Sequence, residues 1–208
     1  MKIANMYSHL NGYEFMLVHK PELWEEIADA IGQIDANHYL KVSNAKPTKG
    51  RVFYDQKALN KCFSDFLLPQ KWMPKVTPYY VTGDIDTARE IAQIREREEQ
   101  KKIIESKGFS AYNTYNQVDF VKERVAVEVQ FGKYFSVAYD LHVKHTFFFL
   151  RNDIDVGIEI IPTKAMCNKM DTGVAWFENE VANVIREGRS NPTVPIVMIG
   201  IEPEKIEI

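Results

Sequence analysis

The chain has 208 residues, which is enough for one domain with a sizeable core and too few for two complete ones. A net charge of -3 and a pI near 6.0 argue against a general nucleic-acid coating protein, although a nuclease needs only a local basic surface. No long apolar run or signal peptide is recognisable, so we expect a cytoplasmic protein with no membrane contact. The two cysteines, Cys62 and Cys167, are too few for a disulfide framework or a zinc site.

Two helices are predicted in the first third of the chain. One starts at Pro21, a residue favoured at the first helical position, and carries apolar residues at helical spacing to residue 34. The other covers residues 56–68 and ends before Pro69. Residues 69–83 hold three prolines and several aromatic residues, which predicts an irregular loop with short extended pieces. Charges of alternating sign over residues 84–107 predict one or two exposed helices.

A strand with alternating character follows. Val125, Val127 and Val129 alternate with Ala126, Glu128 and Gln130, which predicts a half-buried strand with Glu128 and Gln130 on the face opposite the valines. Asp119 lies in a preceding apolar run, and a polar turn at residues 122–124 separates the two runs. Pairing of the runs as a hairpin would bring Asp119 close to Glu128 on an exposed sheet face. Such an oxygen-rich site suits Mg²⁺, although an ordinary charged strand facing solvent is the alternative.

The last third of the chain predicts a helix over residues 137–150, a buried strand over 154–161, a helix over 174–185 and a strand over 194–201. Strand, helix and strand in succession indicate a right-handed crossover between parallel strands. Together with the antiparallel hairpin, this predicts an α/β fold with a mixed central β-sheet flanked by helices, in a single domain of residues 1–208.

These residues carry a resemblance to a known family. Asp119, Glu128 and Gln130 match the Asp…Glu-x-Lys signature of the PD-(D/E)xK nucleases, with glutamine in place of the usual lysine. The segment 119–134, the opening residues 7–12 and the closing residues 194–201 closely resemble the BglII/BstYI group of type II restriction endonucleases. The similarity to BstYI-like members covers almost the whole chain, and that to BglII-like members is confined mainly to the hairpin.

The resemblance implies a homodimeric, Mg²⁺-dependent endonuclease with the restriction-endonuclease-like fold. Its expected substrate is double-stranded DNA at a palindrome around GATC, 5′-RGATCY-3′, cut after the first base to leave 5′-GATC overhangs. A cognate DNA methyltransferase is the expected partner in the host. One alternative is a different enzyme, a repair or recombination nuclease with little sequence preference. The other is not an enzyme: a catalytically inactive DNA-binding homologue.

The catalytic residues expected are Asp119, Glu128 and Gln130. The metal ligands expected are the carboxylates of Asp119 and Glu128, with the backbone carbonyl of Val129. The neutral amide of Gln130 cannot act as a base or lend a positive charge, so its expected role is to orient water or substrate through hydrogen bonds.

Other polar residues are candidates for DNA contact or for chemistry. Lys133 and Thr172 are predicted to contact DNA bases from loops; Lys133 could instead hold a phosphate, and Thr172 could instead cap the following helix. The lysine-rich region 46–75 is a candidate DNA surface, or simply a solvated one. His142 and His145 are three residues apart on a predicted helix. They could act as a pair, either as metal ligands or as acid and base, or they could have a purely structural role.

Overall fold

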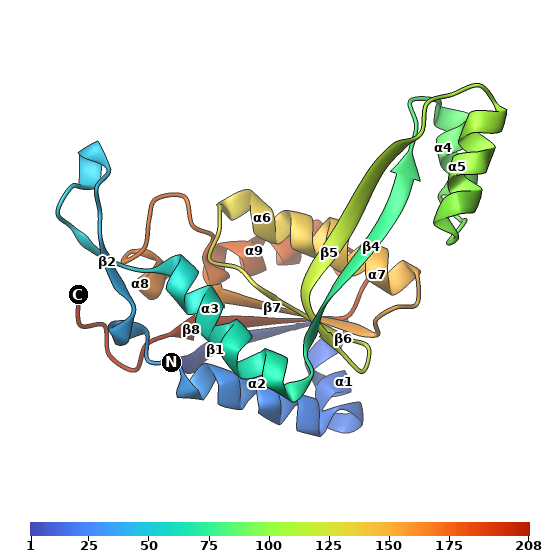
Figure 1. Ribbon diagram of the computed structural model, residues 1–208. Coiled ribbons are helices and arrows are strands. Elements are labelled where there is room, and N and C mark those ends of the chain that lie inside the picture. The colour runs from blue at the N-terminus through green and yellow to red at the C-terminus, as the bar shows by residue number, and fades with distance from the viewer.

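The computed structural model describes residues 1–208 and is built around one six-stranded sheet (Figure 1). The strand order is β1-β8-β7-β6-β5-β4. The strands are β1 (Lys2–His9), β4 (Met73–Val81), β5 (Tyr112–Lys122), β6 (Val125–Val129), β7 (Val156–Pro162) and β8 (Ile196–Glu202). The central strands β6, β7 and β8 are parallel, and the outer strands pair antiparallel. The predicted mixed sheet is therefore confirmed, including the parallel pair at the C-terminus.

Helices cover both faces of this sheet (Figure 1). The helices around the sheet are α1 (Gly12–His19), α2 (Pro21–Gln33), α3 (Gln56–Leu67), α6 (Tyr134–Tyr139), α7 (Thr146–Leu150) and α9 (Phe177–Glu187), with a short α8 (Lys164–Cys167). A π-helical segment, Asp140–His145, joins α6 to α7 without a break. Helices α2 and α3 pack on one face, and the helix running from α6 through α7 packs with α9 on the other.

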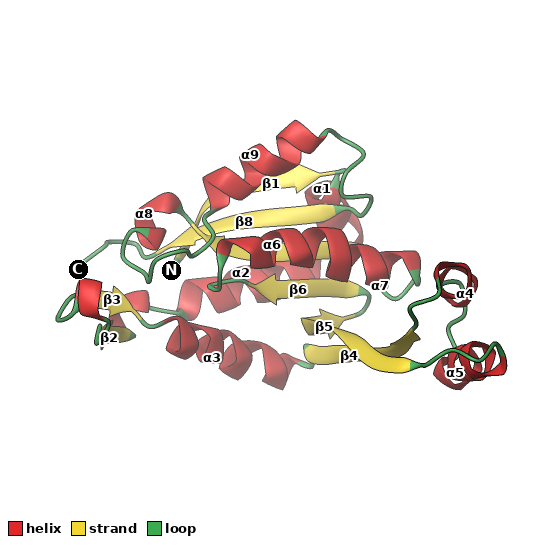
Figure 2. Cartoon of the chain, turned by 90° about the horizontal axis from the view of Figure 1, so that it is seen from above, coloured by secondary structure: helices red, strands yellow, loops and turns green.

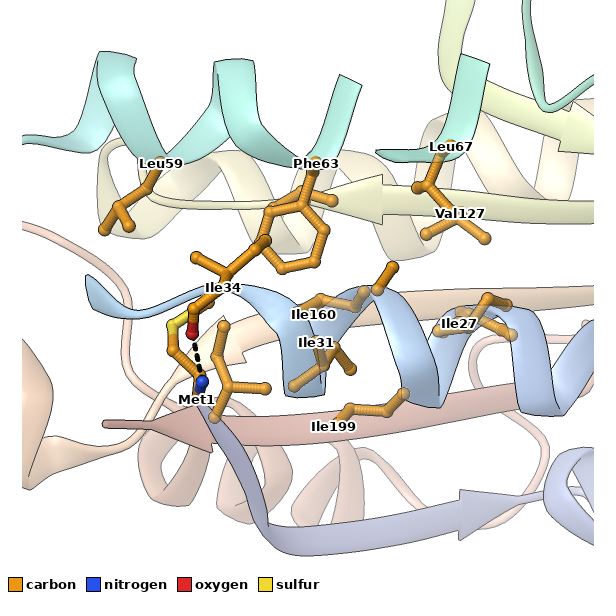
Figure 3. Packing of buried hydrophobic residues seen from close by; sticks show 14 of the residues in the cluster. Met1, Ile27, Ile31, Ile34, Leu59, Phe63, Leu67, Val127, Ile160 and Ile199 are labelled. Carbon is orange, nitrogen blue, oxygen red and sulfur yellow. Dashed lines mark hydrogen bonds between the residues drawn. The ribbon is translucent and has the colours of Figure 1, made fainter. Parts of the chain in front are cut away.

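The alternation seen in the sequence decides which side chains fill which core. Val127 of β6, Ile160 of β7 and Ile199 of β8 point toward Ile31 of α2 and Phe63 of α3 (Figure 3). The intervening residues of the same strands meet the opposite helices; Ala126, for example, packs against Phe148. The sheet is thus buried on both faces, as its parallel centre requires.

Strands β4 and β5 continue beyond the sheet as a two-stranded ribbon. Its far end carries helices α4 (Ile85–Ile91) and α5 (Arg97–Ser106), away from the rest of the molecule (Figures 1 and 2). The prediction of an irregular loop over residues 69–83 is wrong, because β4 occupies Met73–Val81. Pro74 and Pro78 are tolerated in this strand because β4 is an edge strand, whose backbone donors are needed on one side only.

The sequence did not predict β1, nor the small second sheet of β2 (Leu40–Val42) and β3 (Val52–Tyr54). Strand β1 pairs antiparallel with β8 at the other edge of the main sheet. None of the helices has the length and apolar character needed to cross a membrane.

Candidate active site

The hairpin of β5 and β6 brings the predicted metal ligands together. Its strands pair antiparallel, with Phe120 opposite Val127, through a turn in which Glu123 and Arg124 both have positive φ, as in tight two-residue turns. Oδ2 of Asp119 accepts a hydrogen bond from the backbone N–H of Val129 at 3.4 Å. The carbonyl of a strand residue points to the same edge as its N–H, so the Val129 carbonyl also points toward β5, the strand that carries Asp119.

The second carboxylate lies in a different environment from the one expected. Glu128 is only 1% exposed, because the helix from α6 to α7 covers the sheet face that is opposite the valines. The prediction of an exposed sheet face is therefore wrong at this residue. Asp119 stays partly open and lines a cleft of about 280 Å³ with Asn60 and Ser64 of α3. The site therefore has a buried side at Glu128 and an open side at Asp119.

Two functional candidates come from the covering helix and were missed in the sequence. Nζ of Lys144 lies 3.1 Å from Oε1 of Glu128 and 2.7 Å from Oδ1 of Asp140. Asp140 is 1% exposed, and the Lys144 side chain is 19% exposed. The spacing of four residues between acid and lysine was a visible signal, since such pairs meet on a helix. That this pair faces the sheet was not visible, because only tertiary packing places it there.

Gln130 is hydrogen-bonded at both ends of its amide. Its Nε2 donates to Oδ2 of Asp140 at 2.7 Å, and its Oε1 accepts from the backbone N–H of Gly132 at 2.8 Å. Asp140 therefore holds Gln130 with one oxygen and Lys144 with the other. In this arrangement the amide of Gln130 contacts the protein rather than a substrate position.

The site carries more negative groups than positive ones. Glu128 and Asp140 both contact the single ammonium of Lys144. The charge of Asp119 acts on both of these carboxylates, and Glu159 lies beside Glu128 on β7 as its register partner. Burial, followed by the charges of Asp119 and Asp140, raises the pKa of Glu128 to about 9, against the opposing effect of Lys144. Burial likewise raises the pKa of Asp140 and of Glu159.

This excess of acid fits a bound divalent cation. A hard dication beside Asp119 and Glu128 would favour the ionised carboxylates and would oppose the rise in pKa that burial causes at Glu128. The available donors are two carboxylates and one backbone carbonyl, all oxygen, which are ligands that Mg²⁺ accepts. No group of three or more histidine, cysteine, aspartate or glutamate side chains is arranged to hold a metal. Any ion here would thus keep water or substrate oxygens among its ligands.

The two histidines near the site do not form a pair. His145 is fully buried, and its Nε2 lies 3.3 Å from Oε2 of Glu159, while His142 contacts Glu187 at 3.0 Å. Burial, helped by the charge of Lys144, lowers the pKa of His145 to about 3, so its ring is neutral. The structural role for these histidines is the one that the geometry favours.

Lys133 and Thr172 come together at a separate place. Lys133 forms an isolated β-bridge with Val174, and its Nζ donates to the carbonyl of Thr172 at 3.3 Å. Both side chains are exposed. Thr172 does not cap the next helix, because α9 begins at Phe177 and its N-cap residue is Trp176. The prediction that Thr172 caps the following helix is therefore wrong. Thr172 instead lies on an exposed loop that lines a cleft of about 470 Å³.

Comparison with known proteins decides the family. The family model described as restriction endonuclease BglII/BglIII matches residues 4–201, which is nearly the whole chain. The chain belongs to the BglII/BglIII family of restriction endonucleases. By family it is a type II site-specific deoxyribonuclease. The resemblance to the BglII/BstYI group found in the sequence is thereby confirmed at the level of the family.

Two solved structures agree with this fold. BglII complexed with a DNA 16-mer is 18% identical, with a TM-score of 0.67, over 98% of this chain and 78% of the other. Free BglII is 17% identical, with a TM-score of 0.59, over 98% and 81%. At these identities the similarity shows a common fold, and the restriction-endonuclease-like architecture is confirmed. No curated protein sequence matches the chain.

Proposed function

We propose that this restriction endonuclease uses Mg²⁺ to cut double-stranded DNA at palindromes around GATC, at 5′-RGATCY-3′ after the first base. The observation that supports it most is the hairpin, where Asp119 contacts the backbone of Val129 next to Glu128 in a chain of the BglII/BglIII family. A solved relative, BglII, was crystallised on a DNA 16-mer. The specific sequence is taken from the resemblance of residues 119–134 to the BstYI-like enzymes.

The chemistry assigns a separate task to each residue. Mg²⁺, when bound, supplies electrostatic stabilisation of the phosphate and lowers the pKa of the attacking water. Asp119, Glu128 and the carbonyl of Val129 would hold it. Asp119 lies on the open side of the site, where a phosphate can enter, and Glu128 lies on the side from which water is excluded. Neither His142 nor His145 takes part, because both are engaged elsewhere.

A panel of short duplexes tests this function. Duplexes carrying AGATCT, GGATCC and AGATCC should be cut in Mg²⁺ and left intact in EDTA. A duplex with the central four bases changed from GATC to GTAC should resist. Cutting of all four duplexes alike would favour the nuclease of repair or recombination, and cutting of none would favour the inactive DNA-binding homologue.

Recognition of a palindrome calls for a symmetric dimer, and the covering helix offers a surface for it. The apolar sequence Phe147 to Phe149 suggests itself for this contact, but Phe148 is fully buried and cannot take part. The exposed apolar residues on this helix are Tyr134, Phe135, Tyr139, Val143 and Leu150. We expect the protein to sediment as a dimer, both free and bound to a GATC duplex. A monomer in both states would remove the symmetric-palindrome proposal.

Lys133 and Thr172 should determine which site is cut more than how fast the bond breaks. Both lie on exposed loops, and neither contacts Asp119 or Glu128. One good base contact is worth roughly 1–3 kcal/mol of discrimination, so Lys133→Ala or Thr172→Ala should change preference at one base pair. The measurement is the ratio of cleavage rates on AGATCT, GGATCC and AGATCC. Equal losses on all three would indicate a phosphate contact or a scaffold role instead.

Such an enzyme would act on DNA in the cytoplasm. It would need a host DNA methyltransferase that modifies the same sequence, because unmodified GATC palindromes in the host chromosome would otherwise be cut. The proposed roles of Asp119 and Glu128 as metal ligands depend neither on this methyltransferase nor on the cytoplasmic location.

A further inference from the structure

We propose that Lys144 is the positioning residue that supplies, from the covering helix, the positive charge that Gln130 cannot supply from the strand. The inference rests on the proposed function, because it assigns Lys144 a role beside the carboxylates that would hold the metal. In the PD-(D/E)xK signature a lysine occupies the strand position of Gln130. Here the nearest ammonium to Glu128 arrives from a different element, at 3.1 Å.

The helix is built in a way that aims this lysine at the sheet. The segment Asp140–His145 is π-helical, a geometry that is rare and frequently found at functional sites. Its wider turn lets Asp140, Lys144 and His145 all point toward β6 and β7, where they contact Gln130, Glu128 and Glu159. Helix and sheet lie close here, since a Cβ on Gly157 would stand 2.6 Å from the ring of His145. The lysine is therefore held at a tightly packed contact and is not a mobile surface side chain.

Asp140 and Gln130 fix the position of the ammonium. Asp140 binds Lys144 through Oδ1 and Gln130 through Oδ2, and Gln130 is itself held by the N–H of Gly132. A buried carboxylate with two such partners has little freedom to turn. Gln130 thus acts through Asp140 on Lys144, which explains why a neutral residue can occupy the signature position.

Lys144 orients Glu128 and at the same time competes with a cation for it. An ammonium near a metal site repels the metal, so removing Lys144 should tighten metal binding while slowing cleavage. If Lys144 had a merely structural role, its loss would disorder the site and would weaken both metal binding and cleavage. Metal affinity therefore separates the two roles without reference to activity.

The experiment compares four variants with the wild type. They are Lys144→Met, Lys144→Arg, the double variant Gln130→Lys with Lys144→Met, and the control Lys122→Met. Lys122 is buried to a similar degree, with 17% of its side chain exposed, and is paired with Glu26 of α2. Each protein is checked for folding by circular dichroism. It is then titrated with Ca²⁺ alone by calorimetry and assayed for single-turnover cleavage in Mg²⁺.

We expect Lys144→Met to slow cleavage by roughly 10²-fold or more, in line with the loss of one preorganised charge. It should bind Ca²⁺ roughly tenfold more tightly, because a competing cation is gone. Lys144→Arg and the double variant, which returns a lysine to the strand beside Asp140, should each cleave at least tenfold faster than Lys144→Met. Lys122→Met should match the wild type in both measurements.

Weaker or unchanged Ca²⁺ binding by Lys144→Met would overturn the inference, as would a double variant that cleaves no faster than Lys144→Met. Failure of the wild type to cut GATC duplexes would count against the proposed function alone. The Ca²⁺ titration of Lys144→Met would still decide the placement of the charge in that case.

Discussion

Replacing Asp119 or Glu128 by alanine is expected to abolish cleavage, with a loss of at least ~10²- to 10³-fold. Each change removes one of the two carboxylates that would hold Mg²⁺, and no group of three or more histidine, cysteine, aspartate or glutamate side chains is arranged to hold the ion in their place. Folding should survive both changes. Asp119 is a partly exposed residue of β5, and without Glu128 the ammonium of Lys144 keeps Asp140 as its partner at 2.7 Å.

The matched control is Glu123→Ala in the turn of the same hairpin. Glu123 is a carboxylate with a 62% exposed side chain, paired only with Lys20, and its loss should leave the cleavage rate unchanged. All three variants should still bind a GATC duplex in Ca²⁺, because the Lys133 and Thr172 loops are untouched. Wild-type cleavage rates in Asp119→Ala or Glu128→Ala would contradict the assignment of the metal ligands.

A clear loss of stability is expected from a side chain at Gly12, the first residue of α1. A Cβ at this position would stand 2.6 Å from the backbone carbon and oxygen of Ile196. Ile196 starts β8 and is paired with His9 and Gly157, so its backbone cannot move aside. Gly12→Ala should therefore lower the free energy of unfolding by about 1–3 kcal/mol, the usual cost of forcing atoms into a packed core.

Gly32→Ala is the control for this substitution. Gly32 lies in α2, and a Cβ there would meet no atom within 4 Å. Alanine in a helix should raise the free energy of unfolding by roughly 0.5–1 kcal/mol relative to glycine. Urea denaturation of both variants measures the difference. A Gly12→Ala protein as stable as the wild type would show that α1 is not packed against β8 as described.

Periodicity along the chain was enough to predict most of the elements. The helical stripe from Pro21, the alternating valines of β6 and the apolar run of β8 all report burial on one or both faces, and burial is what the sequence pattern encodes. Strand β4 escaped because its prolines indicate a loop unless the strand is known to lie at an edge. Edge position is a property of the assembled sheet and has no local signature.

The candidate site was predictable only along the hairpin. Asp119 and Glu128 are joined by a short turn, so a local pattern brings them together. Lys144 and Asp140 reach the site from a helix that follows the strand, through a π-helical turn that no local pattern indicated. The same packing buries Glu128, which the strand pattern by itself placed on an exposed face. The position of Lys144 and Asp140 and the burial of Glu128 thus depend on contacts between elements, which the sequence pattern does not encode.

The central claim, cleavage at a GATC palindrome, is tested most directly by sequencing the ends of DNA that the protein has cut. Plasmid DNA incubated with the protein and Mg²⁺ should give discrete fragments, and every end should carry a 5′-GATC overhang preceded by a purine in the intact sequence. Fragments with ends at unrelated sequences would contradict the claim, even if the DNA were fully digested.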